Sequence, residues 1–371
     1  MERIGLIVNP IAGLGGRVGL KGSDGLEIQQ RAIELGAIPR ASDRASEALK
    51  YLIRMRFDLD ILTCPGSMGE IAVTQAGFRP HLVDAYQAKP TTAADTRRAA
   101  NEMLQKDLAL LMFTGGDGTA RDIYSICGTE IPVIGIPAGV KIQSAVYAIH
   151  PRAAGELAAT YLQSKAETIL AEVVDLDEEA YRQGRISPRL YGYLKIPYIK
   201  RYIQGVKVSS TTVSSACLKG IAEDISERME PGTIYIFGPG STTQAIATHL
   251  GMDKNLLGVD AYADGKCIAS DANESVLLAI LASNQPVKII LTPIGGQGCI
   301  LGRGNQQISP NVIRKVGKGD ILVVCTKEKL DAFKGRPLWV DTGDDEVDKT
   351  LCGYLPIITG YKEYVMYKVA S

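Results

Sequence analysis

The chain has little histidine, a single tryptophan and no paired cysteines. Only three histidines occur among 371 residues, and because His81, His150 and His249 show no metal-ligand spacing, we expect them to be structural. This leaves little material for histidine-based catalysis or for a metal site with several histidines. The seven cysteines are scattered without a C-x-x-C pair, which argues against a zinc or disulfide framework and predicts reduced thiols packed as small hydrophobic side chains.

The chain also lacks an excess of charge and any long apolar run. Its 41 Lys and Arg residues balance 41 Asp and Glu residues, whereas nucleic-acid-binding proteins usually carry a basic excess. No apolar run approaches the roughly 18 residues of a membrane span, and the first residues lack the apolar core of a signal peptide. We therefore expect a cytoplasmic protein that binds small molecules, and neither nucleic acid nor membrane. We also expect it to form a homo-oligomer.

Glycine is what the sequence has in excess: 39 of 371 residues, where roughly 7% is usual. The glycines form short clusters after apolar runs. These runs predict strands, and the segments between them predict helices. The expected strands lie at 4–8, 59–63, 81–86, 108–114 and 132–136, and the expected helices at 26–35, 91–104, 120–126 and 151–163.

This alternation predicts an α/β protein whose N-terminal domain, residues 1–150, is a doubly wound parallel sheet. We expect a second, strand-rich domain at residues 151–335 with few helices, chiefly 242–250 and 274–283. Its expected strands lie at 169–174, 206–212, 233–237, 287–291 and 320–325. The last segment, residues 336–371, predicts a strand pair that packs back on one of the two domains.

The most specific glycine cluster is Gly115-Gly-Asp-Gly-Thr119, which follows the strongest apolar run and opens a helix. In a doubly wound sheet, ligands bind outside the carboxyl ends of the strands, where glycines and helix N–H groups can approach a phosphate. Asp117 is unusual there because its charge would repel a phosphate. It indicates a group that accepts a hydroxyl proton or holds Mg²⁺. The alternative is a tight turn without chemistry.

This segment resembles the GGDGT motif of the ATP-NAD kinase superfamily, which includes NAD kinases and diacylglycerol kinases. Asn9-Pro-Ile-Ala-Gly13 is similar to the N-P-x-[AS]-G loop of its lipid-kinase branch. Gly238-Pro-Gly-Ser-Thr-Thr243 resembles the T-P-x-G-S-T loop that borders the dinucleotide in NAD kinases, and Leu291-Thr-Pro-Ile294 resembles a later T-P-I segment. Together with Gly238–Thr243, Ile136-Pro-Ala-Gly-Val-Lys141 makes the chain most similar to the acetoin-catabolism X-type proteins of this superfamily.

The resemblance implies an NAD-kinase-like fold and an ATP- and Mg²⁺-dependent phosphotransferase. Its acceptor would be a hydroxyl, by default the adenosine 2′-OH of NAD. Phosphoryl transfer needs positioning and charge neutralisation more than reactive side chains, which suits glycine loops. Asp117 would be the catalytic base, and the metal ligands stay unassigned. Two loops facing each other across a cleft would bind nucleotide and phosphate, through Asn9, Gly13, Gly115, Gly116, Gly118, Thr119, Gly240, Ser241, Thr242 and Thr243.

Three departures from NAD kinases fall on the acceptor side of the implied site. The family's Asn-Glu pair reads Ala171-Glu172 here, which leaves Glu172 as the possible acceptor-binding residue. Gly238 replaces the first threonine of the T-P-x-G-S-T loop, and Gly295-Gly-Gln-Gly298 replaces the usual histidine after T-P-I. Other functions therefore stay open: a kinase for a nucleoside, sugar or polyol, a phosphate donor other than ATP, or a nucleotide-binding regulatory protein without turnover.

Three further segments carry weaker signals. Pro65-Gly-Ser-Met-Gly69 is a second strand-to-helix glycine loop, with a functional or a packing role. The basic-aromatic stretch at 191–201 is expected to be an ordinary loop, although its lysines could face a phosphorylated ligand. The acidic run at 341–348 is expected to be a solvated loop.

Overall fold

The chain divides into two compact units, each with its own sheet. The computed structural model describes residues 2–20, 25–55, 58–83, 91–139, 142–163, 166–176, 188–203, 215–294 and 298–371. The first unit comprises Met1–Leu14 and Gly22–Val206, and the second comprises Gly15–Lys21 and Lys207–Ser371. We call Gly15–Lys21 the N-terminal strap, because it belongs to the second unit although the chain on both sides of it belongs to the first.

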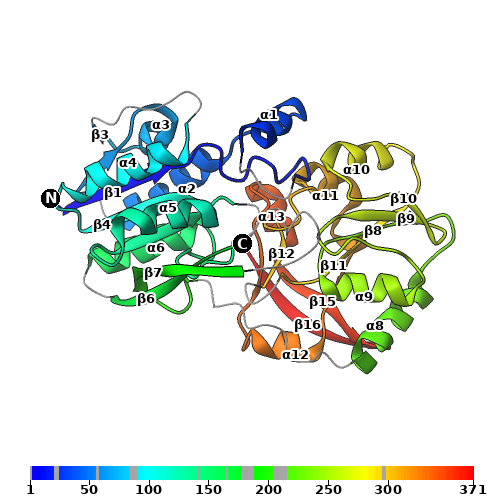
Figure 1. The fold of residues 1–371 in the computed structure, drawn as a ribbon. Coiled ribbons are helices and arrows are strands. Elements are labelled where there is room, and N and C mark those ends of the chain that lie inside the picture. Colours follow the sequence, from blue (N-terminus) through cyan, green and yellow to red (C-terminus); the bar gives the residue numbers. More distant parts are fainter. Residues whose placement is uncertain are drawn as a thin grey trace. The chain divides into compact units, whose positions relative to one another are not determined.

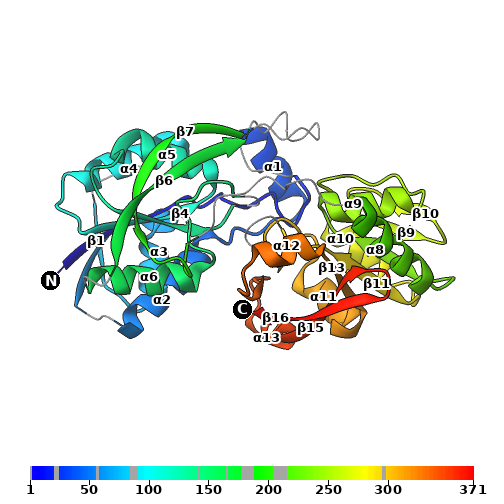
Figure 2. The same ribbon diagram turned by 90° about the horizontal axis from the view of Figure 1, so that it is seen from below.

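The first unit contains a five-stranded parallel sheet in the order β3-β2-β1-β4-β5. These strands are β1 (Glu2–Val8), β2 (Leu59–Thr63), β3 (Pro80–Leu82), β4 (Leu110–Gly115) and β5 (Val133–Pro137). The helices are α1 (Leu26–Glu34), α2 (Ala41–Met55), α3 (Glu70–Gln75), α4 (Ala93–Leu104), α5 (Asp117–Cys127) and α6 (Pro151–Leu162). Helices α4 and α5 cover one face, and α2 and α6 cover the other (Figure 2). The expected doubly wound parallel sheet is confirmed.

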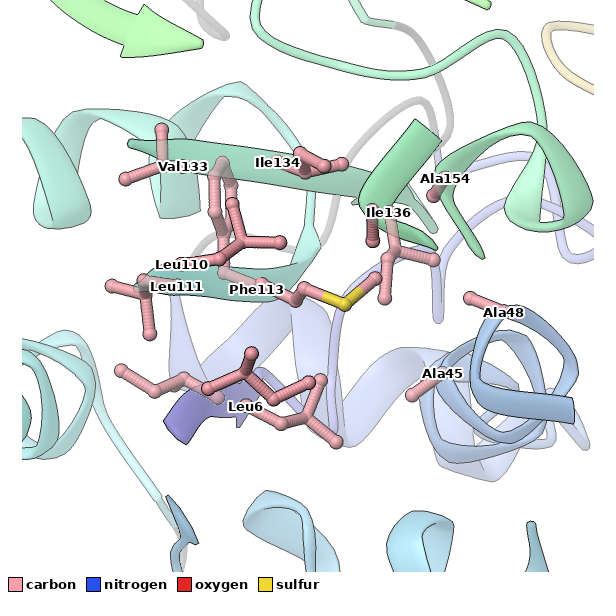
Figure 3. Packing of buried hydrophobic residues seen from close by; sticks show 14 of the residues in the cluster. Leu6, Ala45, Ala48, Leu110, Leu111, Phe113, Val133, Ile134, Ile136 and Ala154 are labelled. Atoms are coloured by element: carbon pink, nitrogen blue, oxygen red, sulfur yellow. The ribbon is translucent and has the colours of Figure 1, made fainter. Parts of the chain in front are cut away.

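The core of this unit lies on both faces of the sheet, and one part of it lies between the sheet and α2 and α6. Figure 3 shows Leu6 and Phe113 on the strands, with Ala45 and Ala48 of α2 close by. Small side chains let the two helices pack closely: a Cβ on Gly155 of α6 would collide with the Ala48 carbonyl. The sequence prediction missed α2, although its apolar residues recur at helical spacing.

An antiparallel ribbon of β6 (Glu167–Leu176) and β7 (Pro188–Tyr198) also belongs to the first unit. It packs against α5, since a Cβ on Gly192 of β7 would overlap the ring of Tyr124. The sequence prediction gave the strand at 169–174 to the second domain. The boundary expected at residue 150 therefore falls inside the first unit, which continues to Val206.

The second unit contains a nine-stranded sheet in the order β10-β9-β8-β11-β13-β15-β16-β14-β12. Figure 1 labels β8 to β12, β15 and β16 of this sheet. Its strands are β8 (Ile234–Phe237), β9 (Asp260–Ala263), β10 (Lys266–Ala269), β11 (Val287–Leu291), β12 (Cys299–Leu301), β13 (Ile321–Val324), β14 (Leu338–Val340), β15 (Gly353–Gly360) and β16 (Glu363–Ala370). The hairpin β15–β16 lies inside this sheet, so the C-terminal segment packs with the second unit.

Helices are more frequent in the second unit than the sequence suggested. They are α8 (Ser215–Arg228), α9 (Ser241–His249), α10 (Glu274–Ile280), α11 (Pro310–Val316), α12 (Lys327–Ala332) and α13 (Asp345–Leu351). Several are too short to show a clear helical period in the sequence. The strand expected at 206–212 lies outside the described residues. Among the described residues, no helix is both long and apolar enough to cross a membrane.

Candidate active site

The carboxyl ends of β1 and β4 form the topological switch point of the first unit. These two strands are neighbours, but the chain leaves β1 toward β2 on one side and leaves β4 toward β5 on the other. The loops that follow such a pair diverge and leave a crevice, which is where doubly wound sheets bind ligands. Two of the predicted motifs, Asn9–Gly13 and Gly115–Thr119, lie at this point.

Asn9 ties these two loops together. Its backbone N–H donates to the Thr114 carbonyl at 3.0 Å, and its Nδ2 donates to Oγ1 of Thr119 at 3.0 Å. Its Oδ1 accepts from the N–H of Ile11 at 3.3 Å. The side chain therefore fixes the position of Thr119 in the first turn of α5 and joins the two motifs.

Asp117 is the first residue of α5, and the residue is 6% exposed. The backbone N–H of Gln143 donates to Oδ2 at 2.7 Å, and that of Ser144 donates to Oδ1 at 2.9 Å. Both oxygens therefore accept a hydrogen bond from the segment after β5. Each carboxylate oxygen has two lone pairs, so one lone pair on each stays available to a further donor.

Burial raises the pKa of Asp117 to about 7, against the hydrogen bonds from Ser144 and Gln143, which lower it. The negative charge of Asp175 on β6 adds a smaller increase of the pKa. Near neutral pH the carboxyl is thus balanced between its ionised and protonated forms. A group with that pKa can take up and release a proton during turnover at physiological pH.

Glycines at this edge allow three loops to pack backbone to backbone. A Cβ on Gly13, which has φ +76°, would overlap the Ala138 carbonyl oxygen. A Cβ on Gly139 would lie 2.8 Å from Cα of Gly116, and one on Gly115 would overlap the Thr119 side chain. Glycine is therefore required here by the packing of the loops themselves. Phosphate binding by Gly13, Gly115, Gly116 and Gly118 stays a prediction.

Tyr147 was not among the residues predicted from sequence. It is fully buried, and its hydroxyl donates to the Gly116 carbonyl in a short hydrogen bond. Its ring lies edge-on to Phe113 and against Gly135, where no larger residue fits. Tyr147 therefore fixes the peptide that precedes Asp117. Its isolated position, 31 residues after Gly116, gives no sequence signal for this contact.

Glu172, the predicted acceptor-binding residue, is half-buried on β6 in the first unit. Its backbone carbonyl accepts from the N–H of Ala145 at 2.9 Å. Ala145 directly follows Gln143 and Ser144, whose N–H groups donate to Asp117. Glu172 therefore belongs to the same neighbourhood as Asp117. Its contact with an acceptor stays a prediction.

Charged side chains around α5 are paired with one another. Arg121 lies 3.1 Å from Asp175 on β6 and stacks on the ring of Tyr191 at 5.4 Å. Asp122 is paired with Arg97 at 2.6 Å. The basic-aromatic stretch expected to be a loop is thus largely strand β7, with Tyr191 packed against arginines.

The predicted loop of the second unit follows β8 and opens α9. Gly240, with φ +133°, precedes the helix. Oγ1 of Thr243 donates within its own turn, to the Gly238 carbonyl at 2.7 Å and to the Gly240 carbonyl at 2.9 Å. Thr242 is buried, whereas Ser241 is exposed. The Thr243 hydroxyl therefore stabilises the loop. Nucleotide binding by these residues, and their position opposite the first loop, stay predictions.

Lys329 is a basic residue that the sequence prediction missed at the same sheet edge. Its Nζ donates to Oγ1 of Thr292 at 3.2 Å, and a Cβ on Gly240 would lie 2.8 Å from Cγ2 of the same threonine. Strands β8, β11 and β13 are parallel neighbours, so the residues that follow them meet here. The sequence signal that could have identified Lys329 is its position shortly after the buried strand β13.

The structure also describes three segments with weaker sequence predictions. His150 caps α6, because its Nδ1 accepts from the N–H of Ala153 at 3.0 Å, so its role is structural as expected. The acidic run is not a solvated loop. Asp344 caps α13, and the buried Asp348 accepts from Thr342 Oγ1 at 2.7 Å. Pro65–Gly69 forms a short 3-10 turn around Gly66–Met68.

Within the described ranges, no three His, Cys, Asp or Glu side chains lie close enough together to hold a metal ion. The seven cysteines, all in that part of the chain, are free thiols, and Cys64, Cys127, Cys299 and Cys325 are buried. Burial raises the pKa of Cys64 to about 12, which keeps it protonated and unreactive. The four buried cysteines pack as small apolar side chains, as expected, whereas Cys267 is exposed.

Comparison with known proteins defines the family. The chain matches the ATP-NAD kinase N-terminal domain over residues 4–166 and the ATP-NAD kinase C-terminal domain over residues 231–369. The two matches together span more than half of the chain, which therefore belongs to the ATP-NAD kinase family. Both of its domains are those of a phosphotransferase family. The narrower likeness to acetoin-catabolism X-type proteins stays a prediction.

Solved structures give only a weak likeness. A putative diacylglycerol kinase from Bacillus anthracis str. Sterne is 16% identical over 47% of this chain and 46% of that chain, with a TM-score of 0.27. Another structure of a diacylglycerol kinase from the same organism is 15% identical over 51% of this chain and 60% of that chain, with a TM-score of 0.22. The chain thus covers less than two thirds of each structure. No curated protein matches it.

Proposed function

We propose that the protein is an ATP-dependent kinase of the NAD-kinase type, which transfers a phosphoryl group to a hydroxyl acceptor, by default the adenosine 2′-OH of NAD. The single observation that supports this most strongly is Asp117. A carboxyl with a pKa of about 7 stands at the switch point of a sheet in a chain of a kinase family. A general base works best when its pKa lies near the working pH.

The proposed reaction uses Asp117 as the base. The acceptor oxygen forms a bond to the γ-phosphorus of ATP, the bond from that phosphorus to the bridging oxygen of ADP breaks, and ADP leaves with the electron pair. Asp117 takes the proton of the acceptor hydroxyl. The N–H groups at the start of α5, an eleven-residue helix, favour negative charge at this place.

The phosphates are assigned to the loops at the two strand ends. In the first unit these are the N–H groups of Gly115, Gly116, Gly118 and Thr119 together with Asn9 and Gly13. In the second unit they are Gly240, Ser241, Thr242 and Thr243. Glycine and helix-start N–H groups suit phosphate oxygens because they donate without a bulky side chain.

Mg²⁺ enters this proposal only as the counter-ion of the ATP phosphates, whose charge it neutralises in phosphoryl transfer. The described residues do not offer it a cluster of three ligands, so no residue is assigned to it and no step passes through it. The cytoplasmic location and the homo-oligomeric state expected from the sequence stay predictions.

The residues expected to bind the acceptor are those in which the chain differs most from NAD kinases. Ala171 and Gly238 stand where the family has an asparagine and a threonine, and each lost hydrogen bond to a ligand weakens binding by roughly 0.5–1.5 kcal/mol. NAD should therefore bind about five- to a hundredfold more weakly than in ordinary NAD kinases. Glu172 keeps the capacity to bind a ribose diol.

A turnover assay with ATP, Mg²⁺ and a panel of acceptors tests the proposal. NADP formation supports an NAD kinase, whereas ATP-dependent phosphorylation of a nucleoside, sugar or polyol supports a kinase with another acceptor. Polyphosphate in place of ATP tests the donor. The D117N variant, purified in parallel, controls for contaminating kinases. Tight nucleotide binding without turnover of any acceptor would contradict the proposal and favour a regulatory protein.

A further inference from the structure

Ser144 links the carboxylate of Asp117 to strand β6. Its side chain is completely buried, and its Oγ donates to the Val174 carbonyl at 2.7 Å while accepting from the Val174 N–H at 3.0 Å. The backbone N–H of the same residue donates to Oδ1 of Asp117 at 2.9 Å. One residue therefore makes two bonds to the strand and one bond to the carboxylate.

The neighbouring residues make the same connection. The N–H of Gln143 donates to the other oxygen of Asp117, and the N–H of Ala145 donates to the Glu172 carbonyl on β6. The segment is thus attached to the strand by residues 144 and 145 and to the carboxylate by residues 143 and 144. Within residues 143–145, the Ser144 hydroxyl is the side-chain group that takes part in these bonds, so it can be removed without changing the backbone.

We propose that Ser144 is a positioning residue for the proposed kinase reaction: its hydroxyl, fixed to Val174, holds the N–H groups of residues 143 and 144 on the Asp117 carboxylate. The effect of Ser144 on catalysis rests on the proposed function. The effect of Ser144 on the Asp117 carboxyl does not depend on turnover.

The coupling has a defined electrostatic consequence. Hydrogen bonds from N–H groups stabilise the ionised carboxylate and so oppose the effect of burial. The hydrogen bonds from Ser144 and Gln143 lower the pKa of Asp117, which burial raises to about 7. If the segment is released, the pKa should rise further, because desolvation then acts with less opposition.

The other groups that face Asp117 are accounted for. Asp175 on β6 is paired with Arg121, Asp122 on α5 is paired with Arg97, and the fully buried Tyr147 has a pKa well above its ordinary value because of burial. The Ser144 hydroxyl makes two bonds to Val174, and its side chain also acts directly on the carboxyl, since a hydrogen bond from it lowers the pKa of Asp117. A change in the Asp117 pKa after substitution of Ser144 would therefore come from the lost hydroxyl and from the N–H groups of the segment that it holds in place.

The S144A variant tests the inference with two readouts. By carboxyl titration in NMR or difference infrared spectra, with D117N to identify the signal, we expect the Asp117 pKa to rise by about one unit, the scale of a lost hydrogen bond to a charged group. In turnover, kcat/KM should fall about fivefold at pH 7 and recover at pH 9, where the carboxyl is ionised again.

Two further variants separate positioning from general stability. T63V removes another fully buried hydroxyl, on β2, which donates to the Leu6 carbonyl of β1 at 2.9 Å, and it should leave the Asp117 titration unchanged. S144C keeps the side-chain size with a weaker hydrogen-bonding group and should give a smaller shift in the same direction. It also serves if S144A does not fold.

The outcomes are distinct for the two proposals. An unchanged Asp117 pKa in S144A and S144C overturns the positioning role, whatever the enzyme does. An activity loss in S144A that persists at pH 9 also overturns it, because the hydroxyl would then act through stability alone. A wild-type protein that turns over no acceptor refutes the proposed function, while the titration still decides the inference.

Discussion

The loops that open α5 and α9 share one sequence pattern, a buried strand, glycines, a polar residue and a helix, yet they use the polar residue differently. Asp117 of α5 accepts from N–H groups 26 and 27 residues away, in another loop of the sheet edge. Thr243 of α9 bonds to carbonyls three and five residues before it. The first contact assembles a site from separate loops, whereas the second stabilises a single turn.

The largest expected effect follows from the long-range contact. D117N should lower turnover at least about a hundredfold, because it removes the base. It should also lower the free energy of unfolding by about 1–3 kcal/mol, because an amide offers one acceptor oxygen to two buried N–H groups. Steady-state kinetics and urea unfolding measure both. D122N on the same helix is the control, and a hundredfold loss there as well would show that α5, not Asp117, was disturbed.

The packing of loops around Asp117 gives the second prediction. G13A should destabilise the first unit by at least about 3 kcal/mol, since it adds backbone overlap with Ala138 to the strain of a positive φ. G36A is matched in backbone angle, with φ +82° and open space around it, and should lose only about 1–2 kcal/mol. Equal losses in urea unfolding would mean that loop packing adds nothing.

The pH dependence of stability gives the third prediction. The pKa of Asp117 is about 7 in the folded protein and lies near 3.8 in the unfolded chain, so between these values the folded state binds the extra proton. Stability should therefore fall as pH rises, by roughly 2 kcal/mol between pH 5 and pH 7. D117N should remove this slope. A wild-type protein that is equally stable at both pH values, after correction for Asp348 with the D348N variant, would contradict a raised Asp117 pKa.

The smallest effect concerns the local turn of α9. T243V should lower the free energy of unfolding by about 1–2 kcal/mol through loss of the hydroxyl, whereas T243S, which keeps it, should stay near wild type. If the hydroxyl only stabilises the turn, kcat/KM of the folded T243V protein should change little. A large loss of kcat/KM with unchanged stability would instead place Thr243 on the substrate and bring the two loops closer in function.

Local features of the fold were predictable from sequence, and long-range ones were not. The strand before Gly115 and the helix after it follow from an apolar run and a glycine cluster, so Asp117 and its place at the strand end were found. The contacts of Asp117 with residues 143 and 144, and of Tyr147 with Gly116, depend on how loops pack and leave no periodic pattern. The boundary at residue 150 was misplaced because ribbon β6–β7 has strand character but packs on α5.

The N-terminal strap has a consequence for how the protein is made. Gly16 packs against Gln306, and the Arg17 carbonyl accepts from the N–H of Glu274 at 3.3 Å, so these partners leave the ribosome more than 250 residues after the strap. Domains generally fold in order during synthesis, but this strap must wait for almost the whole chain. A chain cut at residue 206 would divide the second unit as well, since a fragment beginning at Lys207 lacks the strap.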